Sequence, residues 1–219
     1  MKFIQILAET GKCYYEEVAK LILMGTVSLL CCLLILPGPF AFGGLWAVGQ
    51  RTVRGVGIKW EHYWQGVKEY GWRNFILTVV LLLGYIIGFT NLWFYNTPTI
   101  SPFPAEVAVW VTPIWIVLLV VWTGVSFYAN ALLVELTEPK LWLALRGGLF
   151  LTLLNPLSTF LFIVLSLILL ALCIFLPFLI ILTPGLLLIL RLTAVRTLVQ
   201  AAITKQETQT DKAKNTEDI

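Results

Sequence analysis

The chain has 219 residues, of which 59% are hydrophobic and only 12% are charged, and its mean hydropathy is +0.89. Soluble domains carry about 25% charged residues, so this composition excludes an ordinary soluble protein and indicates that lipid bilayer surrounds much of the chain. The net charge of +3 is too small to indicate a nucleic-acid partner.

Apolar runs predict an all-α integral membrane protein, because a spanning helix needs roughly 20 apolar residues. Five stretches meet or approach that length, at residues 18–36, 75–95, 107–134, 157–176 and 178–199. The first is adequate if Lys20 extends its ammonium to the membrane surface. The last is interrupted by Thr183-Pro184-Gly185, which we interpret as a kink. Residues 1–203 are thus one transmembrane domain, and the polar tail at 204–219 is expected to be disordered.

A shorter segment at 40–53 is the least ordinary part of the chain. It follows Pro37-Gly38-Pro39, which is expected to turn the chain, and it contains Gly43-Gly44. Fourteen helical residues reach only about 21 Å, so this return segment must be shielded by protein, and its glycines allow close approach of other helices. We favour this six-segment arrangement over five spans alone.

Two further stretches have the pattern of amphipathic helices in the membrane plane, at 60–73 and 139–155. Their tryptophans are the candidate interfacial anchors: Trp60, Trp64, Trp72 and Trp142. Both helices are expected on the inner face, because lysine and arginine concentrate at 51–73, at 135–156 and in the tail. The same rule, with six segments, places the N- and C-termini in the cytoplasm.

Arg191 is the most informative charge, because it lies inside an apolar segment, where an unpaired charge is expensive. Glu135, at the end of the third long span, lies near the same depth in this topology. We therefore predict an Arg191–Glu135 contact, and a snorkelling Arg191 is the alternative. The pair could be structural, or Arg191 could serve as a gate or contact an anionic substrate.

The order of these features resembles the YesL-like family of bacterial polytopic membrane proteins, a domain of unknown function. The resemblance rests on three stretches: LPGPFAFGGLWAVGQRTVRG (36–55), WEHYWQGVKEYGWRNF (60–75) and, more loosely, LALRGGLFLTLLNPLSTFLF (143–162). It implies a multi-pass protein of the bacterial cell (inner) membrane with a role associated with transport, possible partners including a sugar-uptake permease. The family has no assigned catalytic or ligand residues to carry over.

Three classes of function remain open. The favoured one is a transport-associated accessory or scaffold subunit of another membrane complex, the alternative is a small oligomeric transporter or channel, and the third is a membrane-embedded enzyme. The enzyme is the least favoured, because the single histidine, His62, has no partner in sequence and no metal-ligand spacing occurs. No catalytic residue, cofactor or metal is therefore expected. A polar cavity around Arg191 would favour the transporter, for which a homo-oligomer is expected.

Overall fold

The computed structural model describes residues 2–32, 37–97, 105–136 and 138–217, and within these ranges every regular element is a helix. The helices are α1 Lys2–Glu16, α2 Val18–Cys32, α3 Pro37–Val53, α4 Trp60–Asn96, α5 Ala105–Glu135, α6 Leu141–Leu154, α7 Pro156–Phe175 and α8 Leu179–Glu217. The predicted all-α class is confirmed.

Among the described residues, four helices are long and apolar enough to cross a membrane: α4, α5 from Ala108, α7, and α8 as far as Ala201. The prediction of five full spans is therefore corrected to four in the described part of the chain. The first expected span, 18–36, appears as α2, whose 15 residues end at Cys32 and reach only about 22 Å. Residues 33–36 of that prediction lie outside the described residues.

α4 joins two elements that the sequence separated, the amphipathic stretch at 60–73 and the span at 75–95. It is one helix of 37 residues, because no proline occurs between 60 and 96 and single glycines do not end a helix. His62 helps to begin it, since the backbone N–H of Lys59 donates to His62 Nδ1 at 3.1 Å. The prediction of a separate helix in the membrane plane at 60–73 was thus wrong, although these residues are helical within α4.

α3 is the short segment predicted at 40–53, and it is shielded by protein as expected. It begins earlier, at Pro37, because proline is tolerated in the first turn of a helix; Pro37-Gly38-Pro39 thus starts a helix instead of forming the turn. Its glycines lie against α4 so closely that a Cβ on Gly43 would be 2.8 Å from Gly71 Cα. This confirms that glycine permits a close helix–helix contact here.

The two ends of the chain differ from expectation. α1 was not predicted, yet it is amphipathic and buries Ile6 and Thr10, and its Tyr14 hydroxyl donates to the Leu182 carbonyl of α8 at 3.1 Å. The tail expected to be disordered continues α8 as helix to Glu217. Residues 186–217 contain no proline or glycine, so no strong helix breaker interrupts it.

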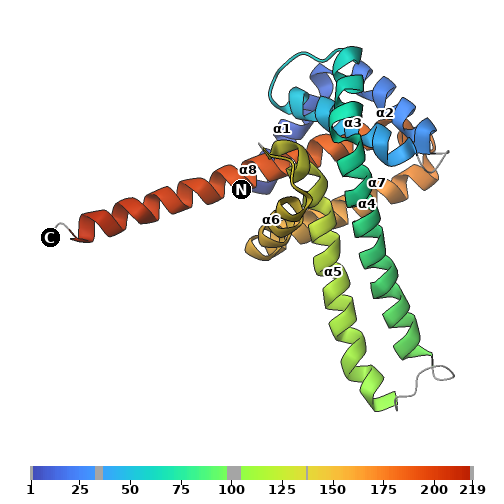
Figure 1. The fold of residues 1–219 in the computed structure, drawn as a ribbon, viewed down its shortest axis with the longest axis vertical. Helices are drawn as coiled ribbons and strands as arrows, with labels where there is room; N and C mark the ends of the chain where they lie inside the picture. The colour runs from blue at the N-terminus through green and yellow to red at the C-terminus, as the bar shows by residue number, and fades with distance from the viewer. Residues whose placement is uncertain (1, 33–36, 98–104, 137, 218–219) are drawn as a thin grey trace.

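The helices do not form one parallel bundle (Figure 1). α4 and α5 run side by side as a hairpin that extends away from the rest, whereas α7 and α8 run across its base. The core lies at this base, where α2, α3, α5 and α8 meet around Leu21, Leu45, Tyr128 and Ile189. The predicted helix at 139–155, now α6, packs on α5 through Gly148, where an added Cβ would lie 3.1 Å from the Val125 carbonyl.

Candidate functional site

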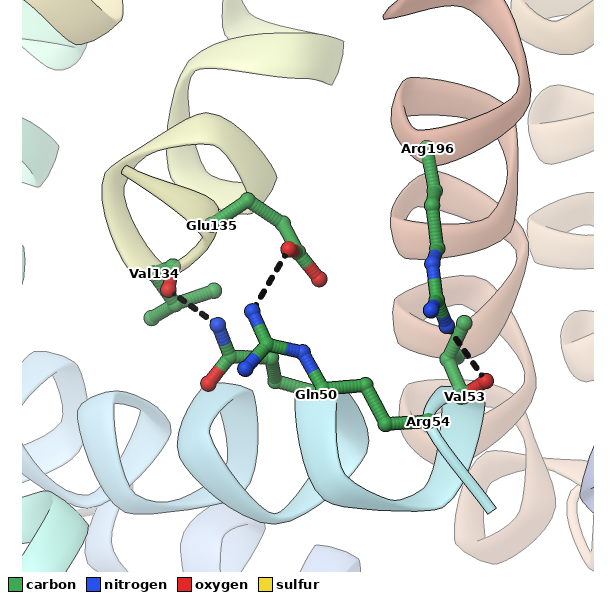
Figure 2. Close-up of polar contacts among 6 residues, drawn as sticks. All are labelled: Gln50, Val53, Arg54, Val134, Glu135 and Arg196. Atoms are coloured by element: carbon green, nitrogen blue, oxygen red, sulfur yellow. Dashed lines mark hydrogen bonds and ion pairs between the residues drawn. The ribbon is translucent and has the colours of Figure 1, made fainter. Parts of the chain in front are cut away.

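Glu135 does not contact Arg191, so that prediction is wrong. Its Oε2 pairs with Arg54 Nη2 at 2.9 Å, across the gap between the ends of α5 and α3 (Figure 2). Glu135 is the last residue of α5 and Arg54 directly follows the end of α3, so their side chains can reach across from one helix end to the other. The prediction paired Arg191 with Glu135 because both were expected at the same depth in the membrane. It could not take into account where α3 lies beside α5, which is what brings Arg54 close to Glu135.

The same end of α3 is held by two more polar contacts. Gln50 Nε2 donates to the Val134 carbonyl of α5, and Arg196 Nη1 of α8 donates to the Val53 carbonyl at 2.8 Å (Figure 2). Carbonyls in the last turn of a helix lack partners within the helix, so these donors satisfy groups that would otherwise be unpaired. This cluster ties α3, α5 and α8 together and is structural.

Arg191 instead points toward Phe127 of α5. Its guanidinium carbon lies 5.1 Å from the centroid of the Phe127 ring, which is cation–π geometry worth about 0.5–2 kcal/mol. Its Nε is buried without a hydrogen-bond partner. Among the described residues, no carboxylate forms an ion pair with it. The aromatic ring is thus the main partner of this charge.

Two adjoining chambers meet at Arg191. The larger, about 460 Å³, lies among α2, α3, α4, α5, α7 and α8, and the smaller, about 360 Å³, lies among α4, α5, α7 and α8. Both are lined by Thr78, Asn130, Leu170 and Arg191. Volumes of 300–1,000 Å³ are typical of small-molecule sites, so either chamber can hold a ligand.

Few hydrogen-bond donors are free in the chambers. The hydroxyls of Thr78, Thr123, Ser126 and Ser166 each donate to a carbonyl of their own helix, at 2.7 to 2.9 Å. Asn130 Oδ1, like Arg191 Nε, is buried without a partner. Arg191 and Asn130 therefore place unpaired polar atoms at the junction of the chambers, where buried polar groups normally have partners.

The positive charge of Arg191 has no acidic counterpart in the described walls of the chambers. Arg191 is the one charged side chain among the described residues that line them, and neither lining includes an aspartate or glutamate. The arrangement is suited to an acidic ligand, because planar guanidinium presents several N–H donors to carboxylate or phosphate oxygens. It provides no described nucleophile–base pair in hydrogen-bond contact.

The predicted interfacial anchors lie on the surface, away from this site: Trp60, Trp64 and Trp72 on α4 and Trp142 on α6 are all exposed. Sequence reasoning identified Arg191 but did not identify Phe127 or Asn130 as residues of the site. A signal was available, because Phe127 and Asn130 are three residues apart and share one face of α5.

Comparisons of the chain with known protein families, with curated proteins and with solved structures found no match. The resemblance to the YesL-like family therefore stays a prediction, and the argument for function rests on the site itself.

Proposed function

We propose that this membrane protein binds an acidic molecule at Arg191 and transports it, as a small transporter. The observation that carries the proposal is the Arg191 guanidinium, whose Nε is buried without a hydrogen-bond partner, at the junction of two chambers with no described acidic residue in their walls. A polar cavity around Arg191 is the feature expected of a transporter; the chambers carry unpaired polar atoms at their junction, on Arg191 and Asn130, and are largely apolar elsewhere.

The energy balance supports an anionic ligand. A central arginine costs about 2.5–3.5 kcal/mol by insertion measurements on membrane helices, and a cation–π contact returns about 0.5–2 kcal/mol. The contact with Phe127 at 5.1 Å thus offsets only part of the cost. A bound carboxylate or phosphate supplies the missing counter-charge and hydrogen-bond acceptors.

The accessory role beside a sugar-uptake permease remains a prediction, because no described contact favours it. We propose a bacterial cell membrane because the resemblance to the YesL-like family implies it, and cytoplasmic termini because of the distribution of lysine and arginine. The exposed apolar faces of α4, α5 and α7 support contact with lipid.

Proteoliposomes on a solid-supported membrane test the proposal. Inorganic phosphate, butyrate and dodecyl phosphate are applied in turn, and the transient current is recorded. At least one probe is expected to give a current that Arg191→Gln abolishes. Arg146→Gln is the matched control, because it removes the same charge from an exposed position on α6 that lines neither chamber. Absence of an Arg191-dependent current with all three probes refutes the proposal.

A further inference from the structure

We infer that the acid bound at Arg191 is an amphiphile with one hydrocarbon chain, which enters the chambers sideways from the bilayer. This inference rests on the proposed function and names its class of substrate. Three features of the chambers carry it: the apolar lining, the position of the openings and the volumes.

The larger chamber is built for hydrocarbon. Away from Arg191 its wall is formed largely by apolar side chains from α2, α3 and α8, among them Leu29, Phe42, Trp46 and Leu187. A fully hydrated anion such as phosphate would lose its water there and find few free donors, at a high cost. An amphiphile needs donors for its head group alone and places its chain against the apolar wall.

The openings of the chambers lie on the apolar outer surface. Leu82 and Leu167 line the smaller chamber and are 57% and 59% exposed, and Leu170 and Ile180 line the larger one and are 51% and 48% exposed. These residues belong to α4, α7 and α8, three of the four helices long and apolar enough to span. A ligand that passes between them comes from lipid, so its body is apolar.

The volumes limit the ligand to one chain. Chambers of about 460 and 360 Å³ fall in the lower half of the range for drug-sized ligands, below what a two-chain phospholipid needs. Arg191 lies where the chambers join, so a head group there leaves the larger chamber for the chain. Asn130 Oδ1, also unpaired at the junction, can accept a hydrogen bond from a protonated head group or a water molecule beside it.

Native mass spectrometry of the full chain, released from mild detergent, measures binding directly. The probes are dodecanoate, butyrate, inorganic phosphate and uncharged dodecanol. Dodecanoate is expected to bind one-to-one to the wild type and to Arg146→Gln. Its binding to Arg191→Gln should be about tenfold to a hundredfold weaker, the loss of one charge-assisted hydrogen bond. Arg191→Lys keeps the charge and should lose less, which separates the role of charge from loss of folding.

The outcomes distinguish the inference from the function on which it rests. If butyrate or phosphate binds at Arg191 as tightly as dodecanoate, the amphiphile is excluded while an acidic ligand stands. If dodecanol binds as well as dodecanoate, the acidic amphiphile is excluded, and if no acid depends on Arg191, both proposals fail.

Lateral entry has its own measurement. Dodecanoate carrying a diazirine in its chain is added to membranes and cross-linked by light, and the modified residues are mapped. Cross-links should fall on the openings, at Leu167 or Leu170, and should decrease when unlabelled dodecanoate competes. Labelling confined to the exposed outer face of the α4–α5 hairpin, without competition, overturns entry from the bilayer.

Discussion

The contact between α3 and α4 predicts the sign of a glycine substitution. Gly43→Ala adds one methyl group where a Cβ would lie 2.8 Å from Gly71 Cα and 2.9 Å from Gly71 N. Both neighbours are backbone atoms, so no side chain can rotate to relieve the clash. The helices must move apart, and the packing around them loosens.

The magnitude follows from two opposed terms. Overpacking a well-packed contact costs about 1–3 kcal/mol, and the upper end applies because the clash is between backbones. Alanine gains about 1 kcal/mol over glycine in helix propensity. The free energy of unfolding should therefore fall by about 2 kcal/mol. Gly11→Ala is the control: Gly11 lies inside α1 with nothing within 4 Å of an added Cβ, so it should raise stability by about 1 kcal/mol.

Equilibrium unfolding in mixed micelles, with increasing dodecyl sulfate and circular dichroism as the readout of helix content, gives both free energies. The two glycine variants should shift the midpoint in opposite directions. If Gly43→Ala stabilises the protein as Gly11→Ala does, then α3 and α4 do not touch at this point and the arrangement of the short helix is wrong.

Two polar contacts give further predictions in the same unfolding assay. Ser28→Ala should lower the free energy of unfolding by about 1–3 kcal/mol, because it leaves the buried Tyr63 hydroxyl, 2.9 Å away, unpaired. Tyr63→Phe should lower it by only about 1 kcal/mol, because Ser28 still donates to the Met24 carbonyl. Equal losses of stability in the two variants would contradict this order. Arg54→Gln and Glu135→Gln should show a coupling of about 1 kcal/mol in a double-mutant cycle, since the pair is partly exposed. Zero coupling would mean that this ion pair does not stabilise the fold.

The length of the apolar runs and the positions of proline and glycine explain which helices could be predicted from the sequence. The spans expected at 157–176 and 178–199 correspond to α7 and the apolar part of α8, because a long, largely apolar run has few alternatives to a helix in a bilayer. α3 was predictable for a different reason: its glycine pair indicates a helix packed closely against another, although its start at Pro37 was expected to be a turn. Both predictions depend on local features alone.

The misses depend on tertiary structure or on a pattern that the charges concealed. α1 places Phe3, Ile6, Thr10 and Tyr14 at helical spacing, but the four charged residues within it lower its mean hydropathy, so it did not stand out as an apolar run. Those apolar positions become informative only once α8 is present to cover them. Amphipathic pattern, not mean hydropathy, is the signal for such a helix.

The candidate site likewise contains one residue that the sequence pattern revealed and others whose role depends on tertiary structure. Arg191 stood out because a charge in an apolar run is unusual, yet its surroundings depend on the rotation of α5, which presents Phe127 and Asn130 to it while Glu135 lies at the helix end. Empty volume between helices has no sequence pattern of its own. The chambers could therefore not be predicted from any single segment.

The glycine contact of α3 also bears on biosynthesis. The residues that α3 packs against, Tyr63 to Gly71, are translated after it, so the contact cannot form until the chain through Gly71 has left the ribosome. Until then the short helix has no α4 to cover its glycine face. Insertion of the N-terminal third is therefore a cooperative step, completed by the later helix and not by each segment in turn.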